Sequence, residues 1–297
     1  MLRHGDEKPN YSMLTTQERD AFINDGYLVI DEAFPPTDLD DLIAEFDASV
    51  DANAAEARAQ ELIDQTFPDE SFSTRLARIV EAAPGRELAD GGILYRNLSG
   101  KLRSPAMFGV LKHPALLDIV ESVIGGEILA HPQFNVRAKL PAQDRSVVPW
   151  HQDLGYLEKD AGETMMVNFW LPLVDATKAN GCLEVISGSH RHLIDHTMGL
   201  GPAGNFKGLT DDVLPDGERV LCPVPKGGVL VLQHKTIHRS LTNTSDHIRW
   251  SLDIRYSHPD QPTGRDGVPG FIARSTKDPS RVAASLEDWD ALFEISA

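Results

Sequence analysis

The feature of this sequence that most constrains its fold is a series of short apolar segments, separated by turns, in the second half of the chain. The segments that we expect to form strands are 134–140, 164–173, 183–186, 219–223, 228–233 and 249–256. Many short strands in series are typical of a sandwich or a barrel. The sequence therefore predicts a mainly β core with flanking helices.

The N-terminal third of the chain has the periodicity and the end signals of helices. We expect helices over 17–24, over 38–50 with a charged continuation to 64, and over 114–123. Thr15 or Thr16 can cap the first helix and Gly26 can close it, ahead of a strand over 27–30. Because no Pro- or Ser-rich spacer separates helices from strands, we expect one domain over 1–297, helix-rich at about 15–125 and with its β core at about 127–260.

The composition argues against several classes of protein. The chain has 297 residues, a formal charge of −17 and only two cysteines. An excess of acidic residues argues against a partner with a phosphate backbone, so we expect no binding to nucleic acid. No stretch is apolar for long enough to span a bilayer, and the first residues lack the apolar run of a signal peptide. Two cysteines are too few for a disulfide scaffold, so we expect a cytoplasmic protein without a membrane partner.

The histidines and acids supply a candidate metal site. His151-Gln152-Asp153 is followed far downstream by His238, and Arg249 lies eleven residues further on. Side chains two residues apart on an extended segment share a face, so His151 and Asp153 can meet one metal ion. Two imidazoles and one carboxylate can occupy one face of an octahedral ferrous ion and leave three positions open. The pattern therefore indicates an oxygenase.

Spacing alone does not identify this site, because a His-x-Asp triplet occurs three times in the chain. The other two begin at His4, in a charged terminus, and at His258, after which no histidine follows to complete a triad. The third ligand is predicted to be His238, which comes just beyond the buried-type strand 228–233. His234 is the main alternative.

Arg249 indicates that the metal site lies near a place where an anion binds. It opens the expected strand 249–256, in which residues 249, 251, 253 and 255 are polar and alternate with apolar residues. Such alternation places all four polar side chains on one face, which indicates a wet or ligand-filled interior. A buried guanidinium needs an anion, and its fork of donors suits a carboxylate. The alternatives are an ordinary salt bridge of Arg249 with Asp253 and a surface position of Arg249.

With these residues the chain resembles the phytanoyl-CoA dioxygenase-like family of Fe(II)- and 2-oxoglutarate-dependent oxygenases. The matching residues are Trp150-His-Gln-Asp153, Trp170, Asn180 to His190, Pro225-Lys-Gly-Gly228, His238-Arg-Ser240 and Arg249, with Asp25 to Ile30 as the first strand. The resemblance covers about residues 15–256. It implies a double-stranded β-helix, which is a cupin-like jelly roll, with iron held at its mouth.

The resemblance also implies roles for single residues. The implied Fe(II) ligands are His151, Asp153 and His238. The implied 2-oxoglutarate residues are Arg249 and Ser240 for the distal carboxylate, with Trp170, Gln133 and Asn135 lining the pocket. Trp170 has a core aromatic as its alternative interpretation, and Gln133 and Asn135 are alternatively polar residues of a strand edge.

The implied reaction consumes O2 and 2-oxoglutarate, releases succinate and CO2, and hydroxylates a small-molecule substrate. Related halogenases carry a small residue in place of the carboxylate, and this chain retains Asp153. Desaturation or oxidative cyclisation stays open, as does a non-catalytic or hydrolytic cupin-like metal protein. Arg137, Lys139 and Arg255 are candidates for contacts with an acidic or hydroxylated substrate, and each is alternatively a surface or ion-pair residue. The long connection 195–217 is either a lid beside the mouth or a disordered surface segment.

Overall fold

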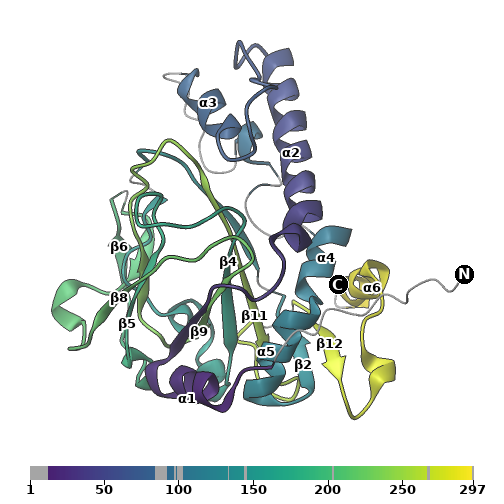
Figure 1. Cartoon of the computed structure of the whole chain (residues 1–297), viewed down its shortest axis with the longest axis vertical. Helices are drawn as coiled ribbons and strands as arrows, with labels where there is room; N and C mark the ends of the chain where they lie inside the picture. Colours follow the sequence, from purple (N-terminus) through teal and green to yellow (C-terminus); the bar gives the residue numbers. More distant parts are fainter. Residues whose placement is uncertain are drawn as a thin grey trace, which may run out of the picture.

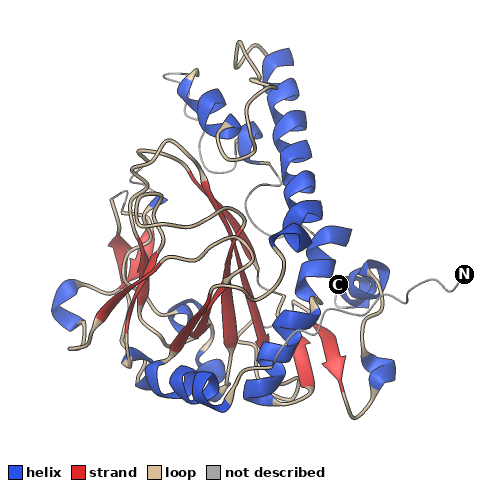
Figure 2. Cartoon of the chain, viewed as in Figure 1, coloured by secondary structure: helices blue, strands red, loops and turns tan. Residues whose placement is uncertain are grey.

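The structure is a computed structural model in which two β-sheets face each other and helices cover the outer side of the larger sheet (Figure 1). It describes residues 13–83, 92–96, 98, 103–132, 134–143, 146–202, 204–265 and 268–295. Figure 2 shows the strands gathered in the two walls of this sandwich, with the long helix α2 beside the larger one. The expected jelly-roll class, mainly β with flanking helices, is confirmed.

The elements are bounded as follows. The α-helices are α1 Thr16–Asp25, α2 Asp40–Ala59, α3 Arg75–Glu81, α4 Pro105–Leu111, α5 Pro114–Ile124 and α6 Leu286–Ile295. The strands are β1 Tyr27–Ile30, β2 Glu127–Ala130, β3 Asn135–Lys139, β4 Val167–Pro172, β5 Leu183–Ile186, β6 Thr197–Leu200, β7 Phe206–Gly208, β8 Arg219–Cys222, β9 Val229–Gln233, β10 His238–Ser240, β11 Arg249–Ser257 and β12 Phe271–Ser275.

The larger sheet has seven strands in the order β1-β9-β4-β11-β2-β12, with β3 also paired to β11. The smaller sheet has the order β10-β5-β8, and β6 and β7 form a separate hairpin. All pairs are antiparallel, and β11 is central because it pairs with β4 on one side and with β3 and β2 on the other. The site residues described below therefore come from both walls of one sandwich.

Strand β11 separates the hydrophobic core from the interior of the sandwich. Its apolar residues Trp250, Leu252, Ile254 and Tyr256 are fully buried in the core shared with the helices. Trp250 stacks on Phe46 of α2 and on Phe72, at ring-centroid distances of 6.4 and 4.7 Å. The alternate residues, from Arg249 to Arg255, face the space between the sheets. Alternation thus works as the sequence predicts, since one face of β11 builds the core and the other builds the site.

Helix α1 has the ends that the sequence predicts. Thr15 and Glu18 form a capping box, in which the Thr15 side chain accepts from the Glu18 amide and Glu18 accepts from the Thr15 amide. Gly26 ends the helix in the left-handed region, with φ 83°, and leads directly into β1. Glycine tolerates this conformation because it has no Cβ.

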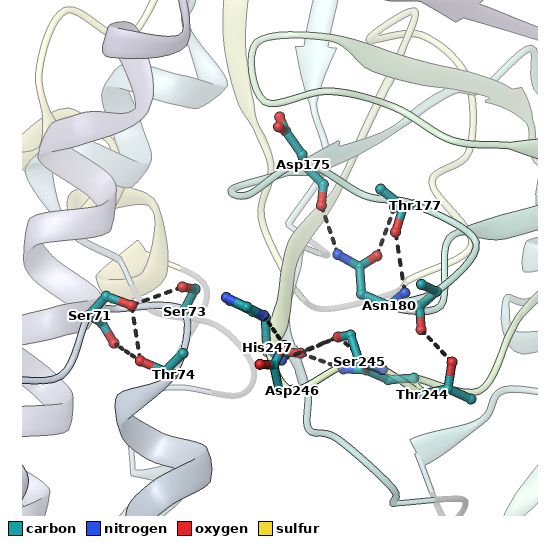
Figure 3. A network of polar contacts seen from close by, with 12 residues as sticks. Ser71, Ser73, Thr74, Asp175, Thr177, Asn180, Thr244, Ser245, Asp246 and His247 are labelled. Carbon is teal, nitrogen blue, oxygen red and sulfur yellow. Dashed lines mark hydrogen bonds and ion pairs between the residues drawn. The ribbon is translucent and has the colours of Figure 1, made fainter.

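The turn between β4 and β5 is held by its own polar side chains (Figure 3). Asn180 Oδ1 accepts from the Thr177 amide at 2.7 Å, and Asn180 Nδ2 donates to the Asp175 carbonyl at 2.8 Å. Thr244 donates to the Ala179 carbonyl, which ties this turn to the segment before β11. The Asn180-Gly181 pair is therefore part of a turn that side-chain hydrogen bonds stabilise.

Several expectations about the elements need correction. The second helix ends at Ala59 instead of continuing to residue 64. Strands β10 and β12 were not predicted, and both are short, at three and five residues. The segment 195–217 contains the β6–β7 hairpin instead of lacking strands. Strands β10 and β12 pair with β5 and β2, which are far away in the sequence, and local patterns do not reveal such pairing.

Candidate active site

Three candidate ligands come together between the two sheets. The ligand atoms of His151, Asp153 and His238 all lie within 4.8 Å of one another. His151 Nε2 lies 3.9 Å from Asp153 Oδ1, and the two imidazole centroids are 4.1 Å apart. Both histidines are buried, at 7% exposure each. Within the described part of the chain this is the one such group of His, Cys, Asp and Glu.

The backbone brings these ligands together across 87 residues of sequence. His151 and His238 form an isolated antiparallel bridge, with amide-to-carbonyl distances of 3.0 Å in both directions. Gln152 has extended backbone angles, and the ligand atoms of His151 and Asp153 lie close together, as alternation along an extended segment predicts. The extended segment ends at Asp153, where a 3-10 turn, Asp153–Tyr156, begins.

Backbone carbonyls fix the tautomer of both histidines. Nδ1 of His151 lies 2.9 Å from the Pro149 carbonyl, and Nδ1 of His238 lies 2.9 Å from the Thr236 carbonyl. A carbonyl only accepts, so each Nδ1 carries the proton and each Nε2 presents a lone pair. Burial, together with the neighbouring His238, lowers the pKa of His151 to about 3. His151 is therefore a neutral donor at physiological pH, as a metal ligand must be.

Two side chains from the larger sheet hold the Asp153 carboxylate. Arg255 Nη2 lies 2.9 Å from Oδ1, and Asn168 Nδ2 donates to Oδ2 at 2.6 Å. Burial by itself raises the pKa of Asp153, but Arg255, the two histidines and Asn168 outweigh it, so the pKa is lowered. The carboxylate is therefore ionised and fixed in orientation.

Arg249 is a buried cation that needs an anion. It is 2% exposed, its Nη1 donates to Ser251 Oγ at 2.7 Å, and its guanidinium carbon lies 5.0 Å from the centre of the Trp170 ring. Its Nε has no hydrogen-bond partner, and no carboxylate among the described residues forms an ion pair with it. Burial lowers the pKa of Arg249 to about 10, so it stays protonated at neutral pH. The expected alternative, a salt bridge to Asp253, is not what the structure shows.

Lys139 lies directly opposite Arg249 in the pairing of β3 with β11. It is 2% exposed, and its Nζ donates to Ser240 Oγ at 3.2 Å and to the Ser146 carbonyl at 2.9 Å. Ser240 also accepts from the Val148 amide at 2.9 Å. Two cations opposite each other on paired strands repel, and an anion between them relieves this cost. Arg249, Lys139 and Ser240 thus form a subsite suited to a carboxylate.

The triad and the carboxylate subsite open into one cavity of about 280 Å³. Its lining includes Arg137 and Asp253, which are paired at 2.6 Å, and Asn205 and Phe206 of the β6–β7 hairpin. Tyr156 donates from its hydroxyl to the Lys207 carbonyl, and Lys207 Nζ donates to the Gly155 carbonyl at 2.6 Å. Residues 205–207 therefore lie beside the cavity, which is the place that one of the two expectations for 195–217, a lid, requires.

Comparison with known families identifies this arrangement. The family model for Phytanoyl-CoA dioxygenase (PhyH) matches residues 22–251. The chain belongs to the phytanoyl-CoA dioxygenase family. This confirms the resemblance drawn from the sequence, and the match extends across both sheets and includes all three candidate ligands.

Individual members of the family and solved structures share only a part of their sequence with this chain. Phytanoyl-CoA dioxygenase domain-containing protein 1 from Danio rerio is 39% identical over 117 residues, which is 37% of this chain and 39% of that protein. L-proline trans-4-hydroxylase from Streptomyces griseoviridis is 31% identical over 189 residues, covering 54% of this chain and 69% of that protein. The structure of EctD from S. alaskensis with 2-oxoglutarate and 5-hydroxyectoine has a TM-score of 0.57 at 17% identity and covers 94% of this chain and 91% of that chain. This last likeness is one of fold.

The remaining predicted residues fall in different places. Trp170 lines the cavity and is also a buried aromatic, at 3% exposure. Asn135 begins β3 opposite Asp253 and is not among the residues that line the cavity. Gln133 lies outside the described residues. His234 is buried against the Ala161 carbonyl and does not belong to the ligand group.

Two residues of this family member were not assigned to the site from sequence. Asn168 shares a face of β4 with Trp170, and that alternation is the signal that could have identified it. Arg255 was predicted either to contact a substrate or to form an ion pair, and the structure places it on Asp153.

Among the described helices, none is both long and apolar enough to cross a membrane.

Proposed function

We propose that this protein is an Fe(II)- and 2-oxoglutarate-dependent dioxygenase that oxidises a small molecule. The observation that carries the proposal is the combination, in one cavity, of two buried histidines and a carboxylate with a buried arginine that lacks a carboxylate partner among the described residues. The first group suits a metal ion and the second suits a dicarboxylate co-substrate. Membership of the phytanoyl-CoA dioxygenase family supports both parts.

The ligands of the ferrous ion are His151 Nε2, His238 Nε2 and a carboxylate oxygen of Asp153. The orientation of both Nε2 lone pairs is set by the Pro149 and Thr236 carbonyls, which is the outer-shell arrangement typical of histidine ligands. Arg255 and Asn168 keep the Asp153 carboxylate ionised and directed toward the histidines. Three protein ligands leave coordination positions for co-substrate and O2.

The distal carboxylate of 2-oxoglutarate binds to Arg249, Ser240 and Lys139, while Trp170 forms one wall of this subsite. Arg249 and Lys139 place two positive charges beside this carboxylate, and their burial excludes water, which strengthens each charge-assisted hydrogen bond. Iron and 2-oxoglutarate, when bound, supply the activation of O2, with release of succinate and CO2. The protein's own part is to orient the co-substrate beside the metal and to exclude solvent from it.

We further propose that the outcome is hydroxylation of a C–H bond. The chain retains Asp153 as the carboxylate ligand, and one relative is named as a proline hydroxylase. Desaturation and oxidative cyclisation use the same site and are the alternative outcomes. The cavity of about 280 Å³ holds a small substrate or the reacting end of a larger one.

The test is titration of 2-oxoglutarate into the full-length protein without O2, with Fe(II) present in one series and omitted in the other. We expect binding that is at least about tenfold tighter with Fe(II), because the co-substrate then has both a metal and a carboxylate subsite. Equal affinity in the two series would contradict the proposed site. A hydrolytic or non-catalytic cupin-like protein would bind the metal but gain no affinity for 2-oxoglutarate.

A further inference from the structure

The pair formed by Arg137 and Asp253 lines the cavity and takes no part in holding the metal or the co-substrate as assigned above. Arg137 Nε donates to Asp253 Oδ2 at 2.6 Å. The two side chains are 44% and 22% exposed, so they lie at the open side of the cavity. Both residues belong to the paired strands β3 and β11.

Each partner keeps hydrogen-bonding capacity beyond this single contact. The two Nη groups of Arg137 make no hydrogen bond to any residue that the structure describes, and Asp253 Oδ1 accepts none from those residues. A guanidinium presents two donor edges, so the Nη edge remains available while Nε stays on Asp253. The pair therefore offers an anion site and a cation site side by side.

The position of the pair along β11 places these sites next to the reaction centre. Asp253 shares a face with Arg249 on one side and with Arg255 on the other. Residues two apart on a strand are separated by about 7 Å. Asp253 therefore lies between Arg249, which belongs to the co-substrate subsite, and Arg255, which contacts Asp153. A molecule held by the pair is therefore close to the metal ligands.

The charges in the cavity favour a substrate that carries both signs. Arg249 and Lys139 are assigned to the distal carboxylate of the co-substrate, and Arg255 pairs with Asp153. Arg137 and Asp253 are thus left as a neutral pair. A purely anionic substrate could use only the Nη edge of Arg137, and a purely cationic one could use only Asp253 Oδ1. A zwitterion gives both partners a new opposite charge without separating the pair.

We propose that Arg137 and Asp253 recognise a small zwitterionic substrate of the amino-acid type, with its carboxylate on the Nη edge of Arg137 and its protonated amine on Asp253 Oδ1. The inference rests on the proposed function, because it assigns Arg249 and Lys139 to 2-oxoglutarate. The small volume of the cavity, about 280 Å³ for substrate and co-substrate together, agrees with a molecule of this size.

The experiment is anaerobic titration calorimetry on the full chain loaded with Fe(II) and 2-oxoglutarate. The probes are the small L-amino acids, including L-proline, together with their N-acetyl derivatives, which lack the cation, and their amides, which lack the anion. We expect at least one amino acid to bind, and its two derivatives to bind at least about tenfold more weakly, since a hydrogen bond to a charged group contributes about 1.5–3 kcal/mol. Failure of every amino acid to bind, or equal binding of the derivatives, would overturn the proposal.

Two variants assign each charge to its partner. In Arg137→Gln the preference for the amino acid over its amide should disappear, and in Asp253→Asn the preference over the N-acetyl derivative should disappear. Preferences that survive in these variants contradict the assignment. Arg78→Gln is the matched control, because Arg78 is similarly exposed, forms an ion pair with Glu81 and lies outside the cavity. Thermal unfolding of each variant confirms that it is folded.

The same titrations separate this proposal from the proposed function. Loss of 2-oxoglutarate affinity in Arg137→Gln by tenfold or more would place Arg137 in the co-substrate subsite and overturn its role with substrate. If the wild-type protein binds no 2-oxoglutarate, the proposed function fails, while titration of the amino acids into the protein without iron and co-substrate still tests the pair. Binding that responds to both variants under those conditions supports the pair on its own.

Discussion

At the scale of single residues, the orientation of the carboxylate of Asp153, a candidate metal ligand, depends on two residues of the larger sheet. Asn168 donates to Asp153 Oδ2 at 2.6 Å, and Arg255 approaches Oδ1 at 2.9 Å. Partners of this kind hold a ligand in the orientation that the metal needs, and their loss lowers metal affinity by about 10–100-fold. We therefore expect Asn168→Ala to weaken Fe(II) binding by about tenfold or more. Competition with a ferrous chelator measures this, and an unchanged dissociation constant would contradict the role of Asn168.

Arg249 provides the residue-scale test of the co-substrate subsite. Replacing it with Gln removes the charge but keeps a hydrogen-bond donor, so 2-oxoglutarate loses a charge-assisted hydrogen bond. We expect the affinity for 2-oxoglutarate to fall by about 10–100-fold, since such bonds contribute about 1.5–3 kcal/mol. Fe(II) affinity should stay within about twofold, because Arg249 contacts no metal ligand. Equal 2-oxoglutarate affinity in the variant and the wild type would remove Arg249 from this subsite.

Residues that would bind the metal or the carboxylate themselves can be predicted well from the sequence. Residues that only orient those groups are harder to predict. His151, Asp153, His238 and Arg249 stand out because metal ligation and carboxylate binding require those residue types. Asn168 does not stand out, since an asparagine in a strand has many possible partners and its partner Asp153 is set by how β4 lies over the 3-10 turn. Arg255 was recognised as polar and inward-facing, but its ion pair with Asp153 also depends on where the 3-10 turn places Asp153.

At the scale of elements, the junction of α1 and β1 leaves no room for a side chain at Gly26. A Cβ there would lie 2.3 Å from His190 Nδ1 and 2.8 Å from Thr236 Oγ1, and the backbone has φ 83°. We expect Gly26→Ala to lower the free energy of unfolding by about 2–4 kcal/mol, from backbone strain and crowding together.

Gly109 is the matched control for this substitution. It lies in helix α4, is exposed, and a Cβ there meets nothing within 4 Å. Gly109→Ala should therefore leave stability unchanged or raise it by up to about 1 kcal/mol. Urea denaturation of both variants measures the difference. Equal destabilisation by the two substitutions would contradict the account of the α1–β1 junction.

Elements with strong local signals are those that the sequence predicts well. Helix α1 has a capping box and a terminal glycine, and β11 has nine residues of strict alternation. Strand β10 has only three residues, and it exists because His238, Arg239 and Ser240 pair with β5 more than fifty residues away. No local pattern encodes that pairing, although it places one metal ligand and one residue of the carboxylate subsite.

At the scale of the whole molecule, buried neutral histidines make stability depend on pH. Burial, with Arg255 and His234 nearby, lowers the pKa of His131 to about 3. An unfolded histidine takes a proton below about pH 6.5, so the unfolded state binds more protons between about pH 3 and 6.5. The free energy of unfolding should therefore fall as the pH falls through this window. His151 and His234, with pKa values lowered to about 3 and 4, act in the same direction.

The variant His131→Gln isolates one of these contributions. Each buried histidine adds a slope of about 1.4 kcal/mol per pH unit below its unfolded pKa. Between pH 6 and pH 4, we expect the free energy of unfolding of the variant to change with pH by about 1.4 kcal/mol per pH unit less than that of the wild type. This difference should hold whatever the stability of the variant at pH 7. Denaturation of the metal-free protein at several pH values measures this. An unchanged slope would show that His131 is not neutral in the folded state.

The central claim is that the site couples Fe(II), 2-oxoglutarate and O2, and succinate release on adding O2 tests it most directly. The account predicts succinate from the wild-type protein only when Fe(II), 2-oxoglutarate and O2 are all present. It also predicts at least about a 100-fold loss in Asp153→Ala, because a ligand acting as part of one unit cannot be replaced by the others. Succinate release that persists in Asp153→Ala, or that needs no Fe(II), would contradict the account.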